Sequence, residues 1–273
     1  MHKQAIFTAA LTAVAINVTA IQPVQAHTSI SDNCSINFTG ELEFHHDVLT
    51  ITLEDGREVA FTENGDVTVN GVYLDLNHEQ QGYAQDYYTH ITDSVPMTVN
   101  IAVDALEIAS TAVTEAFGEL LGYDDDLTQE FGVFFDEIST NINNQFYAED
   151  GSFHIESSRF DNGNWTDTQW EEEFDQKVEE LISKSMGRLL IAIGTEMLWS
   201  DSSDSNGFEA RMESLGDSIE QRVEMQTAEL EVQADELCMT LSKADIAEEA
   251  LRNDISLLQS LNIITVEHNK FSM

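Results

Sequence analysis

Apolar and polar residues alternate with a period of two along the segment 34–76, which is the pattern of strands with one buried face. The pairs Asp55-Gly56, Asn64-Gly65 and Asn70-Gly71 interrupt this alternation, and such residues tolerate the positive φ angles of tight hairpin turns. Consecutive hairpins make an antiparallel meander, whose apolar face needs a cover. The apolar positions of the predicted strands are Ile36, Phe38, Leu42, Phe44, Leu49, Ile51, Leu53, Val59, Phe61, Val67 and Val69.

Beyond residue 76 the apolar positions follow the period of α-helices. Asn77 and Gln80 have the spacing of a capping box, so a helix is predicted to begin there. Pro96 is expected to interrupt that helix, because proline removes a backbone hydrogen bond. A central helix is then predicted over 101–121, closed by Gly122. A third helix is predicted to contain Leu127, Phe131, Phe134, Phe135, Ile138, Ile142 and Phe146.

The last third of the chain predicts two long helices, after a loop or short strand around Phe153 and Ile155. The first opens at Thr166, with Gln169 in capping-box register, and the second follows a polar break at 200–207. Two long helices joined by a short polar segment predict an antiparallel hairpin. A final, shorter helix is indicated by Ile246, Ile255, Leu258 and Leu261.

Together these elements predict an α+β fold, in which an amino-terminal antiparallel β-meander precedes a helical bundle with a long antiparallel helical hairpin. The expected organisation is a signal peptide (1–26), the β-meander (27–76), a helical region packed on the meander (77–165), and the hairpin with a carboxy-terminal helix (166–273). A mature chain of about 247 residues corresponds to one or two domains.

Residues 1–26 have the features of a secretory signal peptide. A basic start at Lys3 leads into an apolar run over 5–21, and the small residues of Val24-Gln25-Ala26 follow where signal peptidase cleaves. Polar residues interrupt the run and no basic cluster follows it, so a retained membrane anchor is disfavoured. The sequence therefore predicts a soluble periplasmic protein whose mature chain begins near His27.

The chain has two cysteines, Cys34 and Cys238, both in the predicted mature part. In an oxidising compartment one intramolecular disulfide is the simplest interpretation. The alternative is a pair of buried free thiols. A redox-active pair is disfavoured, because the chain lacks the C-x-x-C spacing of such sites.

Charge restricts the classes of partner. The chain has 51 acidic and 11 basic residues, a formal net charge of −40, and the segment between Arg57 and Arg159 contains no Lys or Arg. Nucleic acids and anionic lipid surfaces are excluded, because both require basic groups. Cationic partners, divalent cations or salt remain. Salt at about 0.5 M reduces the screening length to roughly 4 Å, so the composition predicts a salt-adapted protein.

A set of residues in the first half of the chain carries a family resemblance: Cys34, the segments 49–51, 66–72 and 76–81, Tyr87, Val95-Pro96 and the segment 101–106. With these residues the chain resembles the YggN-like family of Gram-negative periplasmic proteins of unknown function. The resemblance is specific to about Gly122 and weaker beyond. It implies a periplasmic location and amino-terminal strands followed by carboxy-terminal helices. It supplies no catalytic residues, and the extreme acidity departs from the family pattern.

A calcium site is the best metal candidate in the sequence. Asp204, Asn206 and Glu213 occupy the third, fifth and twelfth positions of an EF-hand pattern. Ser202 and Glu209 stand at the first and eighth positions, where Asp and an apolar residue are usual, so a solvated loop is favoured over a calcium loop. The acidic run Asp124-Asp125-Asp126 is interpreted as a helix start.

Histidines and tryptophans give weaker signals. Adjacent residues on a strand point to opposite faces, so His45 and His46 are not expected to share a metal. Trp165, Trp170 and Trp199 at helical spacing indicate core more than a binding groove.

Three hypotheses about function remain. The chain contains no G-x-S-x-G motif and no phosphate-binding glycine loop, so no catalytic residue and no cofactor is predicted. We therefore favour a non-enzymatic envelope protein that binds a protein or peptide client, in the manner of a chaperone. The alternatives are a hydrolase or other enzyme whose site is assembled from distant residues, and a calcium-binding module.

Overall fold

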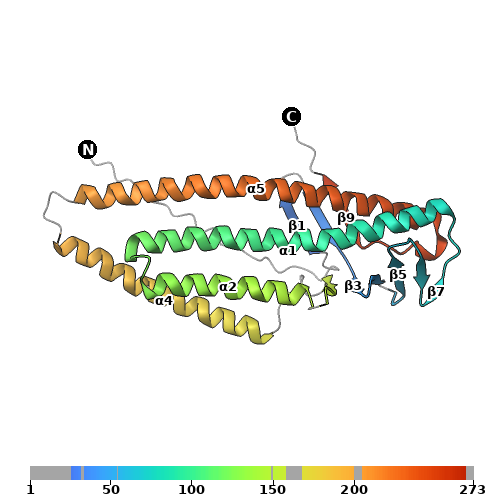
Figure 1. Ribbon diagram of the computed structural model, residues 1–273, viewed down its shortest axis with the longest axis horizontal. Helices are drawn as coiled ribbons and strands as arrows, with labels where there is room; N and C mark the ends of the chain where they lie inside the picture. Colours follow the sequence, from blue (N-terminus) through green and yellow to red (C-terminus); the bar gives the residue numbers. More distant parts are fainter. Residues whose placement is uncertain are drawn as a thin grey trace, which may run out of the picture.

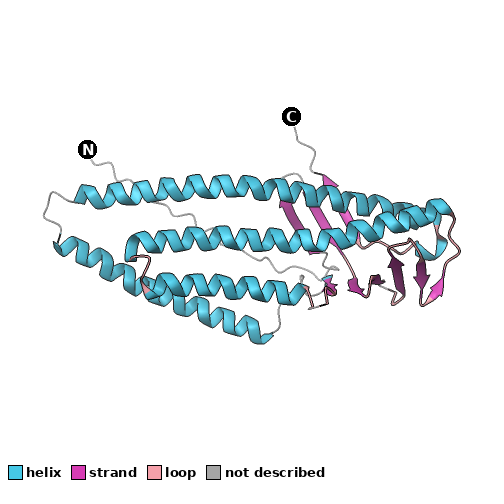
Figure 2. Cartoon of the chain, viewed as in Figure 1, coloured by secondary structure: helices cyan, strands magenta, loops and turns pink. Residues whose placement is uncertain are grey.

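The computed structural model describes residues 26–31, 34–53, 55–148, 150–157, 168–199 and 205–268. Figure 1 shows an elongated molecule in which long helices lie side by side and the strands gather towards one end. Figure 2 shows that helices dominate the remainder. The predicted α+β class, with amino-terminal antiparallel strands followed by helices, is confirmed. Apart from Ala26, the predicted signal peptide lies outside the described residues.

The predicted meander forms most of a six-stranded antiparallel sheet. Asn70 and Gly71 both have positive φ and form the two-residue turn between Val69 and Val72, as the sequence predicts. The order along the sheet is β7-β6-β5-β4-β3-β8. Its strands are β3 (Glu41–His45), β4 (Val48–Thr52), β5 (Glu58–Thr62), β6 (Val67–Val69), β7 (Val72–Tyr73) and β8 (Phe153–Glu156).

A second sheet joins the two ends of the described chain. It contains β1 (Ala26–Ser31), β2 (Cys34–Phe38) and β9 (Ile264–His268), in the order β1-β2-β9. The prediction of one amino-terminal meander was therefore incomplete, because β2 pairs with β9 near the end of the chain. In this pairing Phe38 lies opposite Ile264, which is 226 residues later in the sequence. Hairpin signals report pairing between neighbours in sequence and carry no information about such a distant partner.

The predicted carboxy-terminal helix is wrong. Helix α5 (Ser205–Asp254) ends before Ile255, a 3-10 turn (Ser256–Leu258) follows, and the chain then enters β9. Ile255, Leu258 and Leu261 are buried at three-residue spacing, which resembles a helix. In the structure they lie in two consecutive turns, in which the amide of Leu258 donates to Ile255 and that of Leu261 donates to Leu258. The β-branched run 263–266 then favours a strand.

Helix α1 (His78–Leu121) has 44 residues and includes Pro96, so the predicted interruption is wrong. The capping box of Asn77 and Gln80 and the termination at Gly122 are confirmed. Proline inside a helix costs about 3 kcal/mol. Helix α1 packs along α5 on both sides of Pro96, and these contacts offset the cost.

The remaining helices are α2 (Asp126–Phe146) and α4 (Thr168–Trp199). The Asp125 side chain accepts a hydrogen bond from the Leu127 amide, so the acidic run does begin a helix. Helices α4 and α5 run in opposite directions, as the hairpin prediction requires, but α1 lies between them in Figure 1. Helix α5 packs chiefly along α1, while α4 contacts α1 and α2.

Two apolar clusters divide the molecule. We call residues 26–98, 150–157 and 234–268 the base, and residues 99–146, 168–199 and 205–233 the arm. The base holds both sheets and a large buried cluster. The arm has a small one, which consists of Val99, Leu127, Phe134, Ile138, Ile142 and Leu181.

The predicted disulfide is confirmed and lies in the base. Cys34 on β2 and Cys238 on α5 are joined with an S–S distance of 2.04 Å, and both are buried. On the other side of the base, α1 covers the six-stranded sheet, where the rings of Phe61 and Tyr87 lie 5.1 Å apart. The disulfide therefore fixes the start of the chain to the longest helix.

Candidate functional site

Apolar side chains of helix α1 are less buried in the arm than in the base. Along the arm part of α1 every large apolar side chain from 101 to 117 is only half-buried, whereas the base part of the same helix contains fully buried Tyr87 and Ile91. The arm consists of helices without a sheet, so some helix faces have no second layer of secondary structure to cover them. The half-buried residues are Ile101, Val103, Leu106, Ile108, Val113 and Phe117.

Helix α4 carries an exposed apolar face of the arm. Ile182, Met186 and Leu190 are spaced four residues apart, so they lie on one side of the helix, and each is more than half exposed. Leu181 and Ser185 on the adjoining side are buried against the arm cluster. We call Ile182, Met186 and Leu190 the α4 face.

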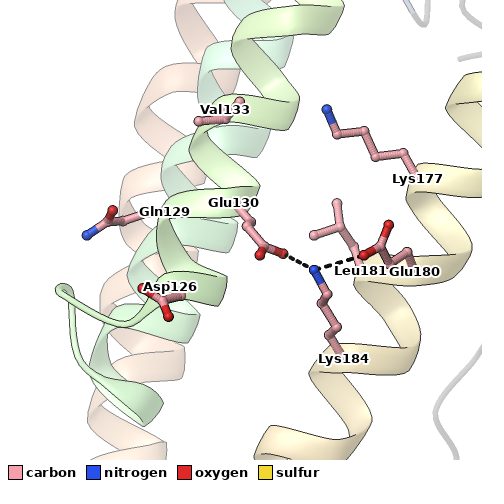
Figure 3. A pocket seen from close by; sticks show the side chains of 8 residues that line it. All are labelled: Asp126, Gln129, Glu130, Val133, Lys177, Glu180, Leu181 and Lys184. Carbon is pink, nitrogen blue, oxygen red and sulfur yellow. Dashed lines mark hydrogen bonds and ion pairs between the residues drawn. The ribbon is translucent and has the colours of Figure 1, made fainter.

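A polar groove of about 500 Å³ separates α4 from α2, with buried Leu181 at its floor. Figure 3 shows Lys184 of α4 lying between Glu130 and Glu180. Its Nζ donates to Glu130 at 2.8 Å and lies 2.9 Å from Glu180, and the hydrogen bond to Glu130 raises the pKa of Lys184. The positive charge of Lys184 is therefore balanced by the two carboxylates and is not available to a ligand.

Two further ion pairs cross the same boundary. Lys177 binds Glu137, and Arg188 donates to Asp125 at 3.0 Å. Three of the chain's 11 basic residues thus serve to attach α4 to α2. Exposed pairs of this kind contribute little to stability, so α4 is held mainly by a short apolar contact.

Helices α1 and α5 enclose a second polar cavity, of about 270 Å³, in the arm. The Nε2 of Gln233 donates to Asp104 at 2.9 Å, while the buried Oε1 atoms of Gln226 and Gln233 accept no hydrogen bond from the residues that the structure describes. A buried polar atom without a partner costs about 1–3 kcal/mol. The packing of α1 against α5 is therefore less favourable in the arm than in the base.

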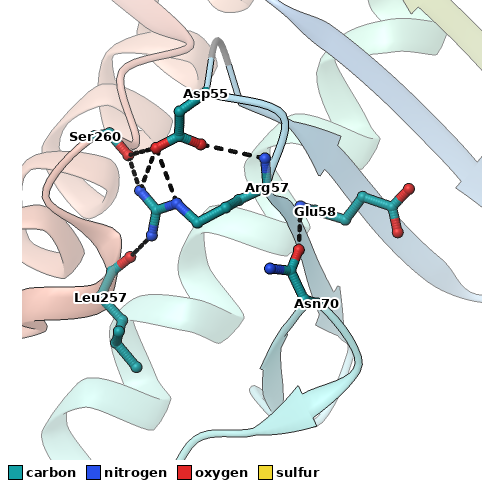
Figure 4. Close-up of polar contacts among 6 residues, drawn as sticks. All are labelled: Asp55, Arg57, Glu58, Asn70, Leu257 and Ser260. Atoms are coloured by element: carbon teal, nitrogen blue, oxygen red, sulfur yellow. Dashed lines mark hydrogen bonds and ion pairs between the residues drawn. The ribbon is translucent and has the colours of Figure 1, made fainter.

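In the base, polar contacts connect the sheet to the end of α5 (Figure 4). Arg57 in the turn between β4 and β5 donates to the Leu257 carbonyl at 2.6 Å and to Ser260. Its hydrogen bond to Asp55 lowers the pKa of that carboxyl group. These contacts are structural, since they close the base around the 3-10 turn.

Glu248 is the most unusual titratable residue of the base, and the sequence prediction missed it. Its side chain is 0% exposed, and it accepts hydrogen bonds from the Tyr87 hydroxyl at 2.9 Å and from the Ile263 amide at 2.8 Å. Burial raises the pKa of Glu248 to about 7 despite these hydrogen bonds. Asp245 accepts in the same way from the Val266 amide, at 3.1 Å. The two carboxylates thus fix the chain before and within β9 to helix α5.

A sequence signal for Glu248 did exist. Buried residues of α5 facing α1 recur with the alternating three- and four-residue spacing of a heptad seam, and Glu248 occupies one of these positions. A charged residue in an otherwise apolar seam predicts a buried hydrogen-bonded group. The seam positions are Ala234, Leu237, Leu241, Ala244, Glu248 and Leu251.

The structure gives the calcium candidates a helical backbone where it describes them. Asn206 and Glu213 lie within α5, which is not the conformation of an EF-hand loop, and Asp204 lies outside the described residues. Within the described ranges no three His, Cys, Asp or Glu side chains are placed to hold a metal ion. A calcium site that uses Asp204 stays a prediction.

The histidines lie differently from the expectation. His46 has a φ of 50° in the β3–β4 turn, and its ring centroid lies 3.7 Å from that of His45, so the two side chains are neighbours. His45 pairs with Asp150 at 3.7 Å, and His154 lies 3.3 Å from Glu41. The structure does not describe the side chains of the three tryptophans.

Fold and surface define an α+β protein with a sheet-built base and a helical arm that exposes apolar faces. Comparison with family models matches residues 34–264 to the family described as "Protein of unknown function (DUF2884)", and the chain belongs to that family. Neither the curated proteins nor the solved structures give a match. In the described part of the chain, no helix has the length and apolar character needed to cross a membrane.

Proposed function

We propose that this protein is a periplasmic protein that binds other polypeptides through its helical arm, without acting as an enzyme. The observation that carries the proposal is the α4 face, where Ile182, Met186 and Leu190 are exposed to water side by side. Contiguous apolar residues at a surface mark sites of interaction with proteins or membranes. The charge of −40 disfavours anionic lipid surfaces, which leaves polypeptides.

The half-buried residues of α1 extend this argument along the arm. A client segment with apolar side chains would remove Ile182, Met186 or Leu190 from water, at about 25 cal/mol per Å² of apolar surface. The net charge of −40 keeps the protein dispersed, because like charges repel between molecules. A surface that combines both properties suits transient binding of exposed apolar segments.

Two features support the periplasmic part of the proposal. Residues 1–26 have the pattern of a cleaved leader, and the disulfide between Cys34 and Cys238 belongs to an oxidising compartment. Osmotic-shock fractionation followed by amino-terminal sequencing tests this part. We expect a periplasmic product beginning near His27. A cytosolic product with an intact leader would overturn it.

Suppression of aggregation tests the binding part. Light scattering of heat-denatured citrate synthase is suitable, because it needs no reductant that would open the disulfide. We expect the native protein to suppress aggregation in proportion to its concentration. The variant Ile182→Asn, Met186→Asn, Leu190→Asn should lose most of this activity while keeping its helical circular dichroism.

A matched control is available in the base. Val72 and Tyr73 on the edge strand β7 are at least as exposed as most of the α4 face, so Val72→Asn with Tyr73→Asn removes similar apolar surface elsewhere. We expect this control to behave as the native protein. Equal losses in both variants, or no suppression by the native protein, would refute a binding role for the arm.

A further inference from the structure

A second exposed apolar surface runs along α5, on the side away from α1. Met225, Val232, Met239 and Ile246 are seven residues apart, and their side chains are 62%, 68%, 58% and 68% exposed. Relative to the buried seam that begins at Ala234, these four residues occupy the outermost heptad position, which is normally the most polar position of a packed helix. We call these four residues the α5 stripe.

Acidic residues flank the stripe on both sides. Positions three and four residues away on the helix surface include Glu229, Asp235, Glu236 and Glu249, and all four are exposed. Within the part of the chain that the structure describes, none of these four carboxylates forms an ion pair. Two basic residues, Arg222 and Lys243, also lie at flanking positions, and Arg222 is paired with Glu115. The stripe is therefore an apolar line whose margins carry four carboxylates, with an excess of negative charge that is greatest around Glu229, Asp235 and Glu236.

We propose that the α5 stripe docks an amphipathic helix of a partner protein, with apolar residues at heptad spacing and lysine or arginine beside them. The excess of carboxylates beside the stripe requires a positively charged partner, since Glu229, Asp235 and Glu236 would meet basic side chains across the interface. This surface is distinct from the α4 face and does not depend on the proposed binding of clients by the arm.

The spacing of the stripe selects a helix as the partner. Seven residues of an α-helix advance about 10.5 Å, so a second helix with the same repeat meets each stripe residue in register. A bound β-strand presents same-face residues about every 6.8 Å, which matches the stripe only at every second residue. An extended peptide would therefore leave half of Met225, Val232, Met239 and Ile246 poorly covered.

A second copy of the chain is the competing occupant, and charge disfavours it. Two stripes packed together would place the acidic margins of one molecule against those of the other, around Glu229, Asp235 and Glu236. Each copy also carries a net charge of −40. Like charges opposed across an interface suppress that pairing.

The test uses a labelled synthetic peptide of four heptads, with leucine at a and d and lysine at e and g. Fluorescence anisotropy with the full-length protein is measured in about 50 mM and about 500 mM sodium chloride. A scrambled peptide of the same composition controls for nonspecific attraction by the net charge. A third peptide with glutamate in place of lysine controls for sign. We expect the heptad peptide to bind at least about tenfold more tightly than either control at the higher salt.

Variants locate the bound peptide. The variant Met225→Ser, Val232→Ser, Met239→Ser, Ile246→Ser changes only outward-facing positions, so the helix should remain folded, and it should weaken binding about tenfold or more. Asp235→Lys with Glu236→Lys should weaken binding of the basic peptide chiefly at low salt. The control Val72→Ser with Tyr73→Ser should bind the peptide as the native protein does.

Equal binding of the heptad and scrambled peptides, or full binding by the four-site stripe variant, would overturn the proposal. So would light scattering that shows a dimer which the stripe variant dissociates, because the occupant would then be a second copy. Loss of peptide binding in the stripe variant with unchanged suppression of citrate synthase aggregation would support a separate docking surface. Failure of the α4 variant to affect aggregation would contradict the role of the α4 face and leave the α5 stripe untouched.

Discussion

The base and the arm share helices α1 and α5 but bury them very differently. In the base, α1 and α5 lie on two sheets, and residues such as Tyr87 and Leu251 are fully buried. In the arm, the same two helices continue with half-buried apolar residues and an unsatisfied polar cavity. A helix buries only the face that another layer covers, so the sheets and not the helix sequences set the difference.

The kinds of cross-link differ in the same way. The base is closed by a buried disulfide and by the buried hydrogen bonds of Glu248. The arm is closed by exposed ion pairs such as the one between Lys184 and Glu130. Buried contacts keep their strength in salt, whereas exposed pairs are screened. We therefore expect the arm to open at lower free energy than the base.

Removing the disulfide should have the largest effect and should fall on the base. The bond closes a loop with a sequence separation of 204, for which the chain-entropy estimate is about 5 kcal/mol as an upper value. Cys34→Ser with Cys238→Ser should lower the free energy of unfolding by several kcal/mol in urea denaturation. Hydrogen exchange of the arm amides should change little. Equal acceleration of exchange in arm and base would contradict the division into two regions.

A matched pair of truncations on α5 compares the regions directly. Leu251 is fully buried in the base and Leu230 is half-buried in the arm. Leu251→Ala should cost about 4 kcal/mol of unfolding free energy, and Leu230→Ala about 1 kcal/mol, because a larger cavity and more contacts are lost in the base. Urea denaturation followed by circular dichroism measures both. Similar losses for the two variants would show that the arm is as well packed as the base.

Glu248 predicts a pH dependence that belongs to the base. Its pKa in the folded protein is about 7, above the ordinary value of 4.5, so the folded protein holds the proton more tightly than the unfolded chain. Protonated Glu248 therefore adds to the free energy of unfolding below pH 4.5, and this stabilisation, at most about 3 kcal/mol, is lost as the pH rises through 7. The Glu248→Gln side chain cannot ionise, so the free energy of unfolding of this variant should not show this decrease with pH.

The comparison of native protein and Glu248→Gln isolates this effect from the other carboxylates, which both proteins share. Urea denaturation at pH 5, 6, 7 and 8 should show the variant gaining on the native protein across this range. In the variant the amide oxygen can still accept from the Ile263 amide, while the amide NH2 group can donate to the Tyr87 hydroxyl, so both contacts are kept and the second is reversed in direction. A constant difference between the two proteins at all four pH values would show that Glu248 does not titrate there.

Sequence reasoning located most elements because their signals are local. Asn77 with Gln80, the turn at Asn70-Gly71 and the termination at Gly122 each act within a few residues. Pairing of the two cysteines also followed from their number and the predicted compartment. The exposed α4 face and the α5 stripe could not be predicted, since apolar residues at helical spacing usually indicate core.

By itself, the sequence determined most of the strands and helices, their caps and turns, the charge and the disulfide partners, because each depends on residues near in sequence or on composition. Tertiary structure alone decided that β2 pairs with β9, that α1 continues through Pro96 and that α1 separates α4 from α5. It also decided which apolar faces stay in water. These outcomes depend on contacts between distant segments, whose free energies compete with local preferences and are not encoded in any short stretch of chain.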